Sequence, residues 1–177
     1  MFRSTIYPVI NTPIEKILDF VVKPGNSQSK DCINKEIIIN APVEKIFNFV
    51  VKPSNLKQIW PSLLEIRNEQ YIPSGGYSAK WLYKMGGFFL QGTTICIDMI
   101  PNQWFVYKTG GDIDSTISWT FRKKEIQTRV TFSVDYEIPI PVLGRFAESI
   151  VVDINNREAE LLLNNLKKVF ESRTEES

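Results

Sequence analysis

The chain has 177 residues, of which 43% are hydrophobic and 12% aromatic, enough for one compact domain with a core and a short appendage. Its 21 basic and 20 acidic residues nearly cancel, so it carries no electrostatic signature of a nucleic-acid-binding or membrane-surface protein. The sequence has no histidine, which excludes Ser-His-Asp and Cys-His catalysis and every His-ligated metal site.

Targeting signals and metal-binding motifs are also missing from the sequence. There is no apolar run as long as a membrane span and no signal-peptide pattern, so we expect a cytoplasmic protein without an integral membrane segment. Cys32 and Cys96 stand apart without metal-ligand spacing, and we expect two free thiols rather than a disulfide. We expect neither a metal nor an obligatory cofactor.

One segment of 17 residues occurs twice in the first third of the chain. Residues 10–26 recur 29 positions later as residues 39–55, with 12 identical positions. This similarity indicates that a strand-helix element has been duplicated. The first copy carries a strand over residues 4–10 and a helix over residues 13–22, but polar residues 25–31 replace its second helix. We therefore treat residues 1–32 as an extension of the main domain.

The helix of the first copy keeps an apolar face, formed by Ile14, Ile17, Leu18 and Val21. Such a face needs a partner, because an isolated helix of about ten residues is marginal in water. It can pack on its own domain, replace the equivalent element in a second protomer, or stay disordered. The retained apolar pattern argues against disorder, and we favour a homodimer through this element as a hypothesis.

The second copy begins the main domain. Residues 36–40 are rich in β-branched side chains and predict a strand. Pro42 lies in the first turn of the helix that follows, where a missing N–H is tolerated, and Pro53 ends that helix. Residues 54–60 predict a second short helix.

Six strands follow at hairpin spacing, separated by turns rich in Gly, Pro and Asn. They are predicted at residues 63–71, 77–85, 88–100, 103–109, 113–122 and 128–136. Apolar and polar residues alternate along them, so that one face is apolar and aromatic and the other faces water. The pattern predicts a single curved antiparallel sheet.

A long helix is predicted from Val142 to about Phe170, with a length of about 40 Å. Its apolar stripe is expected at Leu143, Ala147, Ile150, Ile154, Leu161 and Leu162. Residues 33–172 then form the main domain, and residues 173–177 form a polar tail.

Several short motifs carry a resemblance to a known superfamily. They are Ile39-Asn-Ala-Pro-Val-Glu-Lys-Ile-Phe-Asn-Phe-Val, Trp60-Pro61, Ile100-Pro-Asn-Gln-Trp-Phe, Thr128-Arg-Val-Thr-Phe, and Leu143-Gly-Arg-Phe followed by Asn156-Arg-Glu-Ala-Glu. Together with the order of elements, they resemble the START/Bet v 1-like helix-grip (SRPBCC) superfamily, in its polyketide cyclase/dehydrase-like branch. Because the motifs are structural, they point to a fold and not to a ligand.

The resemblance implies an α+β helix-grip fold, in which a curved seven-stranded antiparallel sheet wraps around the C-terminal helix and leaves a cavity. Members bind hydrophobic or amphipathic small molecules such as lipids, quinones and polyketides. A minority catalyse cyclisation or dehydration, and others are accessory proteins that act through their surface. We favour binding for transport, storage or sensing, and keep the enzyme and the accessory protein as alternatives.

Ligand-binding residues are expected where aromatic side chains crowd the inner face of the sheet. These are Trp81, Tyr83, Phe89, Phe105, Tyr107, Trp119, Phe132 and Tyr136. From the long helix we add Ile154 and Glu158, because the Arg157-Glu158 pair interrupts the apolar stripe. Core packing is the competing interpretation for each aromatic residue. Glu158 with a cavity tyrosine is the one acid-base pair to name, although their spacing does not require a reaction.

The homodimer hypothesis predicts a difference between the full chain and a shortened chain that begins at Cys32. We expect the full chain to be a dimer and the shortened chain a monomer, because the latter lacks the first copy. Size-exclusion chromatography with light scattering measures both masses. Two monomers would refute the hypothesis.

Overall fold

The computed structural model describes residues 31–137 and 148–172. The first copy of the duplicated element, and with it the homodimer hypothesis, lies outside these residues. So do the predicted start of the long helix before residue 148 and the tail at 173–177.

Seven antiparallel strands form one sheet with the order β1-β7-β6-β5-β4-β3-β2. The strands are β1 (Asp31–Ile39), β2 (Leu63–Tyr71), β3 (Tyr77–Met85), β4 (Phe88–Ile100), β5 (Trp104–Gly111), β6 (Asp114–Lys124) and β7 (Gln127–Glu137). Strands β2 to β7 are a meander, and β1 closes the sheet by pairing with β7. The predicted seven-stranded antiparallel sheet is therefore confirmed.

The first strand is longer than the predicted strand at residues 36–40. It pairs with β7 along its whole length, from Asp31 opposite Tyr136 to Ile39 opposite Thr128. Residues 31–35 contain too few β-branched side chains to predict a strand locally. Their strand conformation comes from this long-range pairing with the last strand of the sheet.

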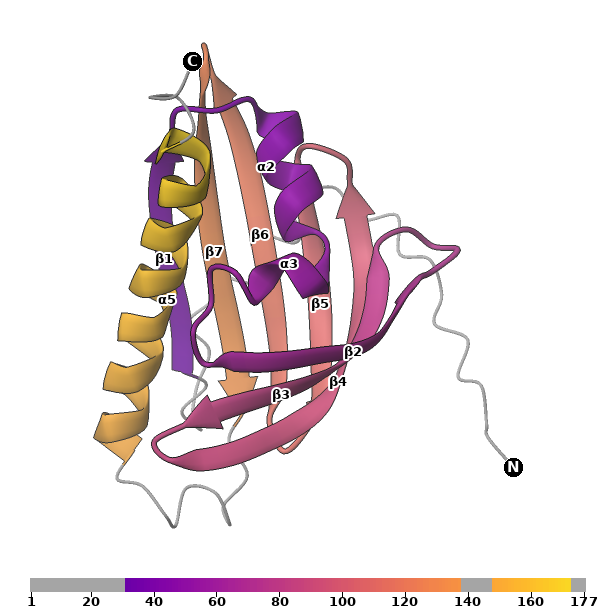
Figure 1. The fold of residues 1–177 in the computed structure, drawn as a ribbon, viewed down its shortest axis with the longest axis vertical. Coiled ribbons are helices and arrows are strands. Elements are labelled where there is room, and N and C mark those ends of the chain that lie inside the picture. Colours follow the sequence, from indigo (N-terminus) through magenta and orange to yellow (C-terminus); the bar gives the residue numbers. More distant parts are fainter. Residues whose placement is uncertain (1–30, 138–147, 173–177) are drawn as a thin grey trace, which may run out of the picture.

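Three helices lie on one side of the sheet: α2 (Val43–Val50), α3 (Pro53–Leu56) and α5 (Glu148–Glu171) (Figure 1). Helix α5 runs beside β1, and α2 and α3 cross the curved sheet in front of the other strands. Helix α3 is shorter than predicted, because residues 57–60 continue as tight turns. In these turns the Gln58 N–H donates to the Asn55 carbonyl at 3.0 Å and the Ile59 N–H to the Leu56 carbonyl at 3.1 Å.

The buried face of α5 differs from the predicted stripe. Ala159, Leu162, Leu163 and Leu166 are buried, whereas Leu161 is 46% exposed. The prediction of Leu161 as a stripe residue is therefore wrong. Residues 159, 162, 163 and 166 share one face at helical spacing, and Leu161 lies about 100° from Leu162 around the axis. The side chains of Leu143, Ala147 and Ile150 are outside the described part of the chain.

Polar contacts fix the C-terminal half of α5 to its neighbours. The Lys35 ammonium pairs with Glu160 at 2.8 Å, and the Lys167 ammonium donates to the Ile38 carbonyl at 3.0 Å. Asn165 donates from Nδ2 to the Ile59 carbonyl at 3.1 Å. This half of the helix is therefore held against both β1 and the turns that follow α3.

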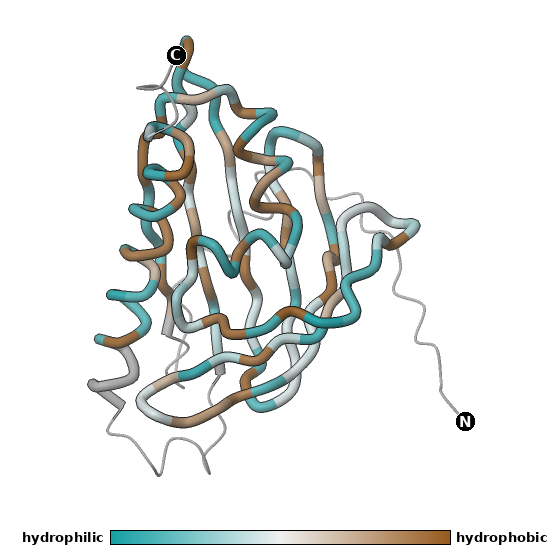
Figure 2. The backbone as a smooth tube through the Cα atoms, viewed as in Figure 1, coloured by the Kyte–Doolittle hydropathy of each residue, from teal (hydrophilic) through white to brown (hydrophobic). Residues whose placement is uncertain are grey.

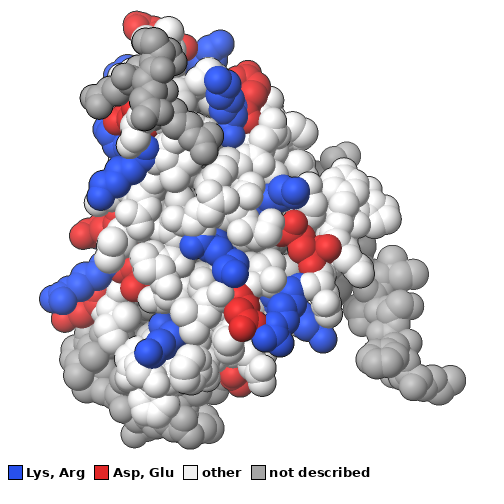
Figure 3. All heavy atoms as spheres, in the orientation of Figure 1, with Lys and Arg blue, Asp and Glu red and all other residues white. Residues whose placement is uncertain are grey.

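The core lies between the sheet and the two helices α2 and α5. Ile46, Phe47 and Val50 of α2 are buried, and the Phe47 ring meets Phe105 and Phe121 edge-on at centroid distances of 5.7 and 5.5 Å. Apolar and polar residues alternate along the strands (Figure 2), as expected for a sheet with one buried face. On the face shown in Figure 3, basic and acidic side chains are interspersed. Among the described helices, none combines the length and the apolarity needed to cross a bilayer.

A buried hydroxyl joins the end of the sheet to the start of α2. Thr128 is fully buried, and its Oγ1 donates to the Ala41 carbonyl at 2.8 Å. We expect Thr128→Val to lower the free energy of unfolding by about 1–3 kcal/mol, because the Ala41 carbonyl then stays buried without this donor. Urea denaturation measures the change, and Thr128→Ser, which keeps the hydroxyl, is the control. Equal losses in both variants would contradict this explanation.

Candidate ligand pocket

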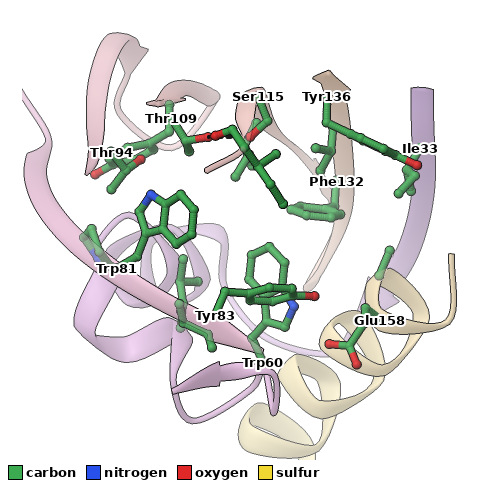
Figure 4. A pocket seen from close by; sticks show the side chains of 18 of the residues that line it. Ile33, Trp60, Trp81, Tyr83, Thr94, Thr109, Ser115, Phe132, Tyr136 and Glu158 are labelled. Carbon is green, nitrogen blue, oxygen red and sulfur yellow. Dashed lines mark hydrogen bonds between the residues drawn. The ribbon is translucent and has the colours of Figure 1, made fainter. Parts of the chain in front are cut away.

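A pocket lies between the inner face of the sheet, α3 and α5 (Figure 4). We call it the central pocket. Its free volume is about 140 Å³, and most of the side chains around it are aromatic or aliphatic. Eight of the ten residues expected from the sequence line it: Trp81, Tyr83, Phe105, Tyr107, Trp119, Phe132, Tyr136 and Glu158. Whether they contact a ligand stays a prediction.

The other two expected residues are not in the wall of the central pocket. Phe89 is 63% exposed, because alternation along β4 turns its neighbour Leu90 inward and places Phe89 on the outer face. Its ring lies 5.7 Å from the Lys84 ammonium instead. Ile154 packs against the hydrophobic core without reaching the pocket wall.

Trp60 is a lining residue that the sequence did not indicate. It was interpreted as the end of a short helix, whereas its ring stands edge-on to Tyr83 at 5.7 Å and to Phe132 at 5.9 Å. The turns after α3 bring it there, and no periodic pattern marks residues in turns. The lining residues Ile33, Thr94, Thr109 and Ser115 were also missed. Their inward direction follows from strand alternation, but small or aliphatic side chains did not stand out as site residues.

Tyr107 contributes its ring to the pocket wall but not a free hydroxyl. The hydroxyl donates to the Val51 carbonyl at 2.7 Å and accepts from the Tyr77 N–H at 3.2 Å. Burial, together with the nearby Cys96, raises the pKa of Tyr107 far above the ordinary value for tyrosine. The phenol therefore stays protonated and ties the end of α2 to the start of β3.

Glu158, Tyr83 and Trp60 meet at one end of the central pocket (Figure 4). Burial and the negative charge of Glu158 raise the pKa of Tyr83 well above its usual range, so its hydroxyl is protonated at neutral pH. The Tyr83 hydroxyl interacts with the side chains of both Glu158 and Trp60. The Oε2 atom of Glu158 and the Nε1 atom of Trp60 are nevertheless buried without a hydrogen bond of normal geometry to a described residue. Unsatisfied buried polar atoms are unfavourable, so this end of the pocket is suited to receive a polar group of a ligand.

The opposite end of the pocket is polar without a charged side chain among the described residues, and the Nε1 atom of Trp81 is also buried without a partner among them. Thr109 and Ser115 share a hydrogen bond of 2.6 Å between their hydroxyls, shown as a dashed line in Figure 4. The indole of Trp81 on β3 lies over Gly92, which is directly opposite Trp81 on the neighbouring strand β4. A Cβ at Gly92 would meet the Trp81 ring and the Gly110 carbonyl, so glycine is what allows this close approach.

The chemistry open to the described residues is limited. Both cysteines are free, with Cys32 exposed and Cys96 buried, and burial raises the pKa of the Cys96 thiol to about 11. Within residues 31–137 and 148–172, no three carboxylate or cysteine side chains are grouped as metal ligands would be. Glu158 is the charged residue among the described residues of the pocket wall. The described residues thus form an apolar pocket with one carboxylate in its wall.

A curved antiparallel sheet, covered by helices and enclosing an apolar pocket beside its C-terminal helix, is the helix-grip fold. The family model described as polyketide cyclase / dehydrase and lipid transport matches residues 30–171. The chain belongs to this family.

Solved structures with the same fold share little sequence with this chain. The Zhui aromatase/cyclase from a Streptomyces species is 12% identical with a TM-score of 0.69, covering 81% of this chain and 95% of that one. A START superfamily protein from Mycobacterium smegmatis is 15% identical with a TM-score of 0.67, and the match covers 80% of this chain and 97% of that one. A dimer from Colwellia psychrerythraea is 20% identical with a TM-score of 0.54, and the match covers 80% of this chain and 96% of that one. Comparison with curated proteins found no match.

The two hydrogen bonds of the Tyr107 hydroxyl predict a structural role. We expect Tyr107→Phe to lower the free energy of unfolding by about 1–3 kcal/mol, because it removes the donor to the buried Val51 carbonyl. Urea denaturation measures this change. Tyr77→Phe is a matched control, because the bond to the Tyr107 hydroxyl comes from the backbone of Tyr77. A loss in Tyr77→Phe as large as in Tyr107→Phe would contradict this role.

Proposed function

We propose that the protein binds a hydrophobic or amphipathic small molecule, such as a lipid, a quinone or a polyketide, to transport, store or sense it. The observation that supports this proposal is the central pocket itself, an aromatic and aliphatic cavity with a few convergent polar groups. The superfamily is one whose helix-grip fold binds hydrophobic ligands and includes polyketide cyclases, which agrees with this function.

The size of the pocket bounds the part of the ligand that it encloses. A free volume of about 140 Å³ is close to that of an engineered protein cavity of about 150 Å³ that holds benzene. One ring or a short alkyl segment therefore fits inside. Burying roughly 200 Å² of apolar ligand surface contributes at most about 5 kcal/mol, so a one-ring ligand is expected to bind no tighter than about 0.1 mM. A larger ligand would extend out of the pocket.

A cyclase or dehydratase is the second candidate function. It is favoured by the carboxylate of Glu158 beside the hydroxyl of Tyr83, and a structural relative carries the name aromatase/cyclase. The raised pKa of Tyr83 weighs against this tyrosine as a base at neutral pH, which leaves Glu158 for that role. Loss of turnover in Glu158→Gln with ligand binding intact would favour the enzyme. The accessory protein that acts through its surface has less support, because the core is not filled.

Filling the pocket tests the binding function. Thr94 lines the central pocket, whereas its neighbour Thr93 on β4 is exposed on the outer face. We expect Thr94→Trp to weaken binding of the neutral apolar dye N-phenyl-1-naphthylamine at least about tenfold, since the indole takes up the volume that the dye needs. Titration of the dye's fluorescence measures the affinity.

Thr93→Trp places the same side chain one residue away and is expected to leave the affinity unchanged. Native mass spectrometry of the protein as purified adds a second measurement, because a carrier is expected to retain or take up an apolar molecule. Absence of dye binding together with absence of any retained apolar molecule in the wild-type protein, or equal effects of the two tryptophans, would contradict a ligand-binding pocket.

A further inference from the structure

The central pocket has a negatively charged side chain in a lining that is otherwise mostly apolar. Among the described residues of its wall, Glu158 is charged and there is no lysine or arginine. Two basic side chains near this stretch of α5 do not line the pocket: Lys35 of β1 pairs with Glu160 at 2.8 Å, and Arg157 is exposed. The Oε2 atom of Glu158 is buried without a hydrogen-bond partner in the described residues. The pocket thus offers a negative charge that these side chains do not neutralise.

Several aromatic rings lie at the same end of the pocket. Trp60 stands edge-on to Tyr83 and to Phe132, and Phe132 lies 4.8 Å from Trp119 between ring centroids. Figure 4 shows Tyr83 and Trp60 between Phe132 and Glu158. Aromatic faces carry partial negative charge and attract cations, Trp most strongly. A carboxylate next to such faces forms a cation site, because both parts attract the same charge.

The same features reject an anion. A ligand carboxylate about 5 Å from Glu158, at an effective dielectric constant of about 20, is repelled by an energy equivalent to more than a hundredfold in affinity. A neutral hydroxyl can donate a hydrogen bond to Glu158 but gains no charge attraction. An ammonium gains both, and the cost of removing it from water offsets part of that gain. The expected order is therefore amine, then alcohol, then carboxylate.

We propose that the central pocket selects amphipathic ligands with a cationic amine head group, held by the carboxylate of Glu158 and the ring faces of Trp60 and Tyr83, and excludes ligands with a carboxylate head group. This inference rests on the proposed binding function and adds the chemical class of the ligand. The protonated hydroxyl of Tyr83 is consistent with it, since this residue brings no second negative charge to the site.

Three probes that share one phenyl ring and differ in the head group test the proposal. They are 2-phenylethylamine, 2-phenylethanol and 3-phenylpropanoate, titrated into the full chain by calorimetry at neutral pH. We expect the amine to bind about tenfold more tightly than the alcohol and at least about a hundredfold more tightly than the carboxylate. Equal affinities, or tighter binding of the alcohol or the carboxylate, would overturn the proposal.

The variant Glu158→Gln removes the charge and nearly keeps the shape of the side chain. We expect the amine to lose its advantage and to bind within about threefold of the alcohol. The matched control is Glu160→Gln, which removes the same charge two residues further along α5, where Glu160 is exposed and pairs with Lys35. This control is expected to keep the order of affinities. An unchanged preference in Glu158→Gln would overturn the proposal.

These experiments distinguish failure of the head-group preference from failure of the binding function on which it rests. If neither the dye nor any of the three one-ring probes binds the wild-type protein, the binding function fails and the inference fails with it. If any of them binds and the three head groups are not ranked as expected, only the inference fails. The ranking in the wild-type protein is decisive even if Glu158→Gln does not fold. Circular dichroism shows whether the variant is folded.

Discussion

The packing of α2 against β5 and β6 determines where this protein has a core and where it has a pocket. Phe47 packs edge-on against both Phe105 and Phe121, which also contact each other, and covers that part of the inner face. The Tyr107 hydroxyl holds the end of the same helix through the Val51 carbonyl. With α2 fixed there, the central pocket lies farther along the inner face, between the sheet, α3 and α5.

The sequence predicts the sheet well because alternation is a local signal. Trp81, Tyr83, Trp119 and Phe132 were assigned to the inner face from two-residue periodicity alone, and the structure places all four in the pocket wall. Phe89 shows where alternation alone is not enough. As an aromatic residue next to a turn, it is predicted on the inner face. The pairing of Lys84 with Phe89 and of Tyr83 with Leu90 places it on the outer face instead. Register between strands is a long-range property.

The helices, like the sheet, are predicted from the sequence only in part. The start of the second copy and the existence of a long final helix follow from proline positions and helical spacing. The buried face of that helix was misassigned at Leu161, since a short run of leucines fits more than one stripe. Trp60 could not be predicted as a pocket residue, because turns after α3 orient it and turns have no period. Glu158 was found because a charge interrupts an apolar stripe. The sequence could not show that the Oε2 atom of Glu158 has no hydrogen-bond partner among the described residues, because that depends on the three-dimensional surroundings of the side chain.

The close approach of Trp81 to Gly92 has a consequence for how such a pocket can change. The indole lies over a residue that does not itself line the pocket, and a Cβ there would meet the Gly110 carbonyl of β5 as well as the ring. The strands would have to shift before a larger residue could fit, so glycine at this position sets the spacing of the sheet and the position of one pocket wall together. A residue that does not line the pocket thus helps to set the shape of its wall.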